Sequence, residues 1–126
     1  NYDGSQILSL HDSEIKKKLK EIPAYDIALL GMGLDGHFAS IFPKMVNLDE
    51  ALSSNDPICN VKTGVPDVPR ISLTMSEILK AKIIMLLVAD QKKLSIFEDA
   101  LQTPNEKPIS KLIPFAEDLE VLTIKN

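Results

Sequence analysis

The apolar run inside residues 82–88 limits what this chain can fold into more than any other feature. Six apolar residues follow one another there, from Ile83 to Val88. The run is too short to cross a bilayer, which takes roughly 18 to 20 apolar residues. In a protein that folds in water, such a run is typical of a strand covered on both faces. The run therefore predicts a central strand of a buried sheet.

Four other segments have the pattern of strands. Residues 25–30 form a short apolar run closed by a glycine, which predicts a second buried strand. Residues 70–74 alternate apolar and polar side chains, and residues 119–124 form a last strand. The connection 44–69 is rich in proline and polar residues, and we expect only a short strand near 58–62 within it.

Two segments repeat apolar residues every three or four positions, which predicts amphipathic helices. The first helix should have Asp12 or Ser13 as its N-cap and end before Pro23. The second should follow the central strand. The apolar residues are Ile15, Leu19 and Ile22 in the first helix and Leu94, Phe97 and Leu101 in the second.

Local signals predict two shorter helical segments. Thr74 and Glu77 match the capping box, in which a hydroxyl and a carboxylate each satisfy a free backbone N–H. Residues 37–42 have room for one or two helical turns before Pro43. Strands alternating with helices predict an α/β fold with a Rossmann-like, largely parallel sheet flanked by helices. With 126 residues, 44% of them apolar, and no internal repeat, the chain fits one domain.

The charge of the chain excludes several kinds of partner. A net charge of −4 gives no basic field for a nucleic acid or an anionic membrane. The basic run at 16–20 fits a solvated helix face. The single cysteine, Cys59, fits a semi-buried apolar residue better than a nucleophile. Residues 1–6 are polar and the apolar stretch after them is too short for a signal peptide, so we expect a cytoplasmic protein.

The glycine-rich loop after residues 25–30 has the clearest chemical content. In α/β proteins, ligands bind at the carboxyl ends of strands, where backbone N–H groups are free. Glycines there permit a positive φ and let a ligand approach the backbone closely. The loop contains Gly31, Gly33 and Gly36.

The spacing of these glycines also satisfies G-x-G-x-x-G, the dinucleotide-binding pattern. That interpretation fails because Pro43 stops any helix after about two turns. Nor does a strand pattern follow that could present Asp49 or Glu50 to a ribose. A plain tight turn would explain the glycines alone, but it would not explain why Asp35 and His37 flank Gly36. An aspartate two residues from a histidine can fix its tautomer or bind ligand hydroxyls, while the histidine exchanges protons near neutral pH.

Residues 26–43, DIALLGMGLDGHFASIFP, resemble the signature of the 6-phosphogluconolactonases, a family similar in fold to the glucosamine-6-phosphate deaminases. Both share the Gly-x-Gly-x-Asp-Gly-His core. After the histidine the deaminases continue toward Asn-Glu-Pro, whereas residues 39–43, Ala-Ser-Ile-Phe-Pro, are of the lactonase type. Two further matches are residues 69–74, similar to Pro-Arg-Ile-Thr-Leu-Thr, and the central strand followed by Lys92 and Lys93.

The resemblance implies hydrolysis of 6-phospho-D-glucono-1,5-lactone to 6-phospho-D-gluconate in the oxidative pentose phosphate pathway, without a metal or an organic cofactor. His37 would be the base that activates water, and Asp35 would orient it or bind a sugar hydroxyl. Arg70, the only arginine, would bind the phosphate, with a structural salt bridge as the alternative. Lys92 is a weaker ligand candidate, because a lysine there can simply be solvated. Gly31, Gly33 and Gly36 would line the substrate, and backbone N–H groups around Gly33 and Gly36 would serve as donors to the oxyanion.

Members of this family are about twice as long as this chain. The resemblance therefore identifies residues 1–126 as the C-terminal part of a lactonase-like domain whose N-terminal half, with a Gly/Ser-rich phosphate loop and another arginine, is missing. We expect exposed apolar surface where that half would pack, and association of the isolated chain. Asp90 stands where many relatives have glycine, which weakens the assignment of Lys92. Two rivals remain: a deaminase or isomerase, and a sugar-phosphate-binding module without turnover.

Overall fold

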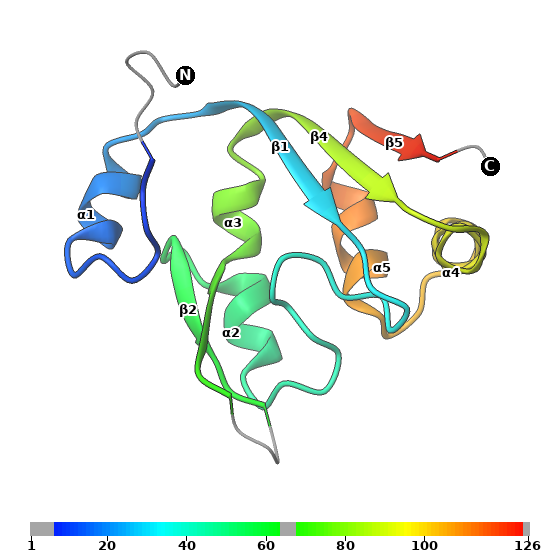
Figure 1. The fold of residues 1–126 in the computed structure, drawn as a ribbon, viewed down its shortest axis with the longest axis horizontal. Helices are drawn as coiled ribbons and strands as arrows, with labels where there is room; N and C mark the ends of the chain where they lie inside the picture. The colour runs from blue at the N-terminus through cyan, green and yellow to red at the C-terminus, as the bar shows by residue number, and fades with distance from the viewer. Residues whose placement is uncertain (1–6, 64–67, 125–126) are drawn as a thin grey trace.

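The computed structural model describes residues 7–63 and 68–124, and it contains two sheets (Figure 1). The larger sheet has parallel strands in the order β1 (Tyr25–Gly31), β4 (Ala81–Val88) and β5 (Leu119–Thr123). The smaller sheet is an antiparallel pair, β2 (Ile58–Val61) and β3 (Arg70–Leu73). All five predicted strands are confirmed, and so is the α/β class with a largely parallel sheet.

The helices are α1 (Ile15–Lys20), α2 (Leu48–Ser53), α3 (Met75–Ile78), α4 (Gln91–Gln102), α5 (Pro108–Leu112) and the 3-10 helix η1 (Ile113–Phe115). Three of them, α1, α3 and α4, lie where the sequence predicts them. The predicted helical turns at 37–42 are wrong, because that segment forms turns and two isolated bridges, Met32 to Phe38 and Phe38 to Ile41. The sequence patterns gave no sign of α2, α5 or η1, which are short and lie in proline-containing connections.

The N-terminus of α1 differs from the prediction. Glu14, not Asp12 or Ser13, occupies the cap position, and its side chain makes no capping hydrogen bond. Asp12 instead accepts a hydrogen bond from the Glu14 N–H at 2.9 Å and pairs with Lys18 at 2.5 Å. Asp12 therefore organises the turn that precedes the helix.

The capping box at α3 is only half formed. The Thr74 hydroxyl accepts a hydrogen bond from the Glu77 N–H, as predicted. The Glu77 carboxylate, however, does not return to the cap. It accepts hydrogen bonds from the Tyr25 hydroxyl at 2.5 Å and the Lys80 ammonium at 2.8 Å. In a complete capping box the glutamate bonds to the N–H of the cap residue, whereas this one is buried and joins the start of β1 to α3.

One face of the large sheet is buried and belongs to the main core. It carries Leu30 of β1 and Ile84, Leu86 and Val88 of β4. Figure 1 shows α3 and α5 beneath this face. Fully buried side chains from those helices and from the loop after β1 complete the core; they include Ile78, Ile109, Leu112, Phe38 and Ile41.

The other face of the same sheet is apolar but largely exposed. Register places Ile27 beside Ile83 and Leu87 beside Leu122. All four of these side chains, and Leu29, count as exposed. For the described residues, the prediction that 82–88 is a strand covered on both faces is therefore wrong, and the predicted buried strand 25–30 is buried on one face only. The prediction of an exposed apolar surface is confirmed.

Candidate functional site

The candidate site is the loop that leaves the carboxyl end of β1, drawn in cyan in Figure 1. Two loop residues, Phe38 and Ile41, are completely buried and fix the loop to the core. Inside the loop, the Gly33 N–H donates to the His37 carbonyl at 2.9 Å, and the Gly36 N–H donates to the Gly33 carbonyl at 3.0 Å. Both of these N–H groups are thus used within the loop, so an oxyanion donor around these glycines would have to be a neighbouring backbone N–H.

Each of the three glycines has a different reason to be present. A Cβ on Gly33 would lie 2.1 Å from Cε1 of His37, so the imidazole packs directly on this glycine. Gly36 has a φ of +81°, which glycine adopts without strain. A Cβ on Gly31 would meet nothing within 4 Å. The described residues require glycine at positions 33 and 36, whereas none of them requires it at position 31.

Asp35 holds the imidazole of His37. Its Oδ1 lies 2.5 Å from His37 Nδ1 and also accepts a hydrogen bond from the His37 backbone N–H at 3.1 Å. Partial burial raises the pKa of Asp35, but these hydrogen bonds and the charge of His37 outweigh it and hold the pKa below the usual 3.8. Asp35 is therefore ionised above that value, and the stabilisation it gives is lost as the pH falls through its lowered pKa. With Nδ1 engaged, Nε2 is the ring atom left for chemistry.

Two distant segments fix the loop from outside. The Ile109 N–H donates to the Gly36 carbonyl at 2.9 Å, and Cβ of Lys107 is 2.7 Å from where a Cβ on Gly36 would lie. On another side, the Ser40 N–H donates to the hydroxyl of Ser72 in β3 at 3.1 Å. The start of α5 and the strand β3 therefore both define the position of His37.

Arg70 lies next to this loop, as the sequence predicts, but it reaches the histidine through a third side chain. The guanidinium carbon of Arg70 is 5.1 Å from the centre of the Phe42 ring. The centre of the His37 ring is 4.5 Å from the same point. Among residues 7–63 and 68–124, no ion pair involves Arg70, so the alternative of a structural salt bridge has no support there.

A hollow of about 340 Å³ opens beside His37, and a lysine lies on its wall. Its lining residues are Leu29, Leu30, Gly31, Met32, Gly33, His37, Ala39 and Lys93. Lys92 is exposed and does not line the hollow, so the structure brings Lys93 to the loop in place of the predicted lysine. The side chain of Asp90 caps α4 by accepting a hydrogen bond from the Lys93 N–H at 2.9 Å. The pair of adjacent lysines was visible in the sequence, but only the helix start decides which one lines the hollow.

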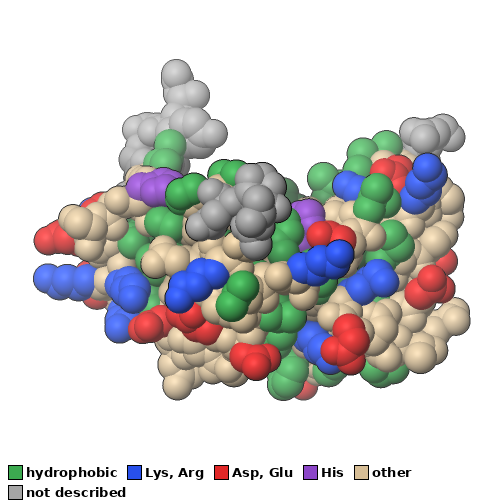
Figure 2. All heavy atoms as spheres, turned by 90° about the horizontal axis from the view of Figure 1, so that it is seen from below, with side chains coloured by type: hydrophobic (Ala, Val, Ile, Leu, Met, Phe, Trp, Pro, Cys, Tyr) green, Lys and Arg blue, Asp and Glu red, His purple; other side chains and the backbone are tan. Residues whose placement is uncertain are grey.

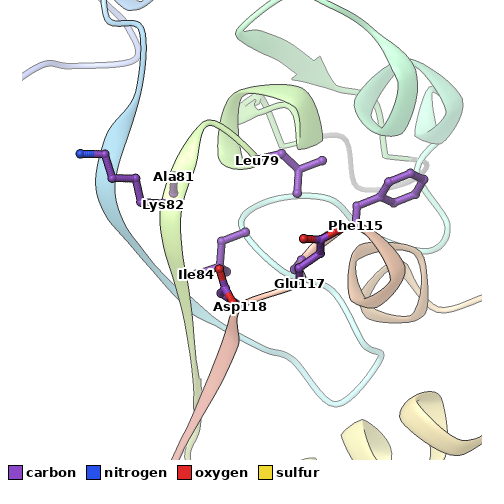
Figure 3. A pocket seen from close by; sticks show the side chains of 8 residues that line it. Leu79, Ala81, Lys82, Ile84, Phe115, Glu117 and Asp118 are labelled. Carbon is purple, nitrogen blue, oxygen red and sulfur yellow. The ribbon is translucent and has the colours of Figure 1, made fainter.

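A second hollow, of about 170 Å³, lies at the amino ends of β4 and β5 (Figure 3). Leu79, Ile84 and Phe115 supply its apolar wall, and Glu117 and Asp118 lie at its rim. None of the predicted site residues lines it. Ligands of parallel α/β sheets bind at the opposite, carboxyl edge, so we assign the chemistry to the hollow beside His37.

Four further observations concern the cysteine, the surface charge, the metal-ligating side chains and the helix lengths. Cys59 is buried, and burial raises the pKa of its thiol, as expected for a cysteine that only packs. Basic and acidic side chains are mixed on the face in Figure 2, which also presents both histidines. No group of three metal-ligating side chains occurs within residues 7–63 and 68–124. None of the helices in those ranges is long and apolar enough to cross a membrane.

The model of one protein family, the glucosamine-6-phosphate isomerases/6-phosphogluconolactonase, matches residues 4–121. The chain belongs to this family. It is 33% identical over 115 residues to a 6-phosphogluconolactonase of Neisseria meningitidis serogroup A, covering 88% of this chain and 50% of that protein. It is 35% identical over 101 residues to a 6-phosphogluconolactonase of Mesorhizobium japonicum, covering 78% of this chain and 42% of that protein.

Solved structures of family members have the same fold. A 6-phosphogluconolactonase from Shewanella baltica is 28% identical, with a TM-score of 0.73 over 86% of this chain and 48% of that one. A monomeric glucosamine-6-phosphate deaminase is 20% identical, with a TM-score of 0.62, which shows the fold alone. The chain spans about half the length of the curated relatives it matches. The resemblance predicted from the loop, including its coverage of about half a family member, is confirmed.

Proposed function

We propose that this chain carries the catalytic loop of an enzyme that hydrolyses 6-phospho-D-glucono-1,5-lactone to 6-phospho-D-gluconate, as in the oxidative pentose phosphate pathway. One observation carries the proposal: the imidazole of His37 is held through Nδ1 by Asp35, on the wall of a hollow that also contains a lysine. The names of the relatives supply the reaction class. The lactonase type of residues 39–43 favours this reaction over deamination.

In the proposed reaction, Nε2 of His37 removes a proton from water as the water oxygen attacks the lactone carbonyl carbon. The carbonyl oxygen becomes an oxyanion. When the tetrahedral intermediate collapses, the bond from that carbon to the ring oxygen breaks, and the imidazolium returns the proton to the departing oxygen. Asp35 holds the tautomer that leaves Nε2 unprotonated and stabilises the imidazolium while it exists.

The charged groups of the substrate and of the intermediate need partners. Arg70 and Lys93 are the cations proposed for the phosphate, and Arg70 can form two parallel hydrogen bonds with it. Ala39 is the proposed oxyanion donor in place of Gly33 and Gly36. Its N–H has no acceptor among the described residues, it lines the hollow, and its φ of +49° is rare for a residue with a Cβ.

The test compares the two histidines of the chain. His37→Ala should lower the enzymatic hydrolysis of fresh 6-phosphogluconolactone by roughly 10²- to 10⁴-fold, the range typical of a lost general base. The comparison variant His11→Ala keeps the proposed base and should lower the rate far less, because His11 lines a different hollow, which it shares with Arg70. Spontaneous opening of the lactone is subtracted with a blank. Equal rates for wild type and His37→Ala would overturn the assignment.

Each of the two rivals has an assay of its own. Release of ammonia from glucosamine 6-phosphate would indicate the deaminase branch. Binding of 6-phosphogluconate by calorimetry, without faster lactone hydrolysis, would indicate a sugar-phosphate-binding module.

A further inference from the structure

Phe42 lies between His37, the proposed base, and Arg70, the proposed phosphate ligand. The imidazole of His37 is 4.5 Å from the centre of the Phe42 ring and tilted by 41° to it. The guanidinium carbon of Arg70 is 5.1 Å from the same ring centre. A single aromatic ring thus contacts the proposed base and the proposed phosphate ligand.

The backbone around Phe42 is well fixed. The preceding residue, Ile41, is completely buried, and its N–H donates to the Phe38 carbonyl at 2.9 Å. The carbonyl of Phe42 itself accepts a hydrogen bond from the Met45 N–H at 3.3 Å. The Phe42 side chain is partly buried and packs against the main core. The ring of Phe42 therefore has little freedom to move when Arg70 or His37 moves.

The strand that carries Arg70 is tied to the same loop at a second point. Ser72, two residues after Arg70, is buried and accepts a hydrogen bond from the Ser40 N–H at 3.1 Å. Its hydroxyl donates in turn to the Leu73 carbonyl at 2.8 Å. The hydrogen bond to Ser72 thus fixes the backbone of β3 relative to the loop. The ring of Phe42 contacts the Arg70 side chain of the same strand.

We propose that Phe42 is a positioning residue that holds Arg70 and His37 at a fixed separation, and so selects lactones that carry a phosphate. The choice of substrate rests on the proposed function. The physical reason is that a guanidinium over an aromatic face is attracted by the ring quadrupole while its edge N–H groups stay available to an anion. An aliphatic side chain of similar size gives no such attraction, so Arg70 would lose its fixed position.

The first experiment measures selectivity rather than rate. The ratio of kcat/KM for 6-phosphogluconolactone to that for glucono-1,5-lactone, which lacks the phosphate, should fall roughly five- to tenfold in Phe42→Leu. Phe42→Tyr keeps the aromatic face and should stay within about twofold of wild type. If Phe42→Leu lowers both kcat/KM values equally, Phe42 only supports the fold and the proposal is wrong.

A double-mutant cycle tests whether Phe42 acts through Arg70. Arg70→Gln alone should lower the selectivity for the phosphorylated lactone. Adding Phe42→Leu to Arg70→Gln should then lower it no further, because residues that act through one contact do not contribute independently. Effects that multiply in the double variant would contradict the proposal.

A third measurement does not depend on turnover. Arg70 is the only arginine, so its guanidinium Nε–H gives a single signal in a nitrogen-15 correlation spectrum of this chain. The signal should move in Phe42→Leu and stay near its wild-type position in Phe42→Tyr. If the chemical shift of the Arg70 signal is the same in Phe42→Leu as in wild type, the proposal is refuted even if the chain is an active lactonase. A signal that moves, in a chain without lactonase activity, would uphold the positioning and refute the proposed function instead.

Discussion

The two faces of the β1–β4–β5 sheet are made of the same kinds of apolar side chain but have opposite surroundings. On one face Ile84, Leu86 and Val88 are buried under helices. On the other face, Ile83 and Leu87 of the same strand keep 36% and 38% of their surface exposed to solvent. The composition of a strand therefore says how much apolar surface must be covered. Which face is covered depends on what packs there.

The strongest test of this comparison uses two neighbouring leucines on β4. Leu86 is fully buried, whereas Leu87 is 38% exposed. Leu86→Ala should lower the free energy of unfolding by about 3 kcal/mol, because it removes packed atoms and leaves a cavity. The matched variant Leu87→Ala should cost less than about 1 kcal/mol. Urea denaturation followed by circular dichroism measures both, and similar losses would mean that the second face is covered in solution.

The next test concerns the buried charge at the edge of the covered face. Glu77 is 4% exposed and accepts hydrogen bonds from Tyr25 and Lys80. Glu77→Ala should lower the free energy of unfolding by about 2 kcal/mol, because it leaves the hydroxyl and the partly buried ammonium without their acceptor. The control Glu14→Ala changes an exposed glutamate and should stay within about 0.5 kcal/mol of wild type. A harmless Glu77→Ala would show that the network adds little to stability.

The smallest effect on folding is expected on the exposed face. Leu29 is 65% exposed and lies beside Met85 in register. Leu29→Ser should change the free energy of unfolding by no more than about 0.5 kcal/mol. It should, however, reduce self-association of the isolated chain, because it interrupts the apolar surface. Sedimentation velocity over a range of concentrations checks this, and unchanged association would place the contact elsewhere.

The sequence predicted the elements well wherever a pattern extended over several residues. The apolar runs of β1 and β4 and the three- and four-residue spacing of α4 are examples. The burial of these strands was predicted wrongly, because the sequence pattern of an apolar run is the same whether one face of the strand or both are covered. The sequence also failed for the helical turns at 37–42, where the buried Phe38 and Ile41 enforce a folded turn instead.

In the candidate site, the sequence could indicate the residue types but not where their side chains and backbone N–H groups point. It predicted His37, Asp35 and Arg70 as site residues, since each stands in a specific motif. It could not show that the N–H groups of Gly33 and Gly36 are used inside the loop, nor which of two adjacent lysines faces the hollow. Those facts depend on the path of the backbone. Phe42 was missed for the same reason, because its contacts join segments far apart in the chain.

The hydrogen bond from Ile109 to Gly36 bears on the order in which parts of the molecule fold. The loop that carries His37 closes only when residues from near the end of the chain have arrived, since its outer supports are Ser72 and residues 107–109. Contacts between distant parts of a chain are slow to form during folding. On the ribosome, β1 would emerge well before the residues that shape the loop beside it. We therefore expect the arrangement around His37 to be among the last features completed during folding.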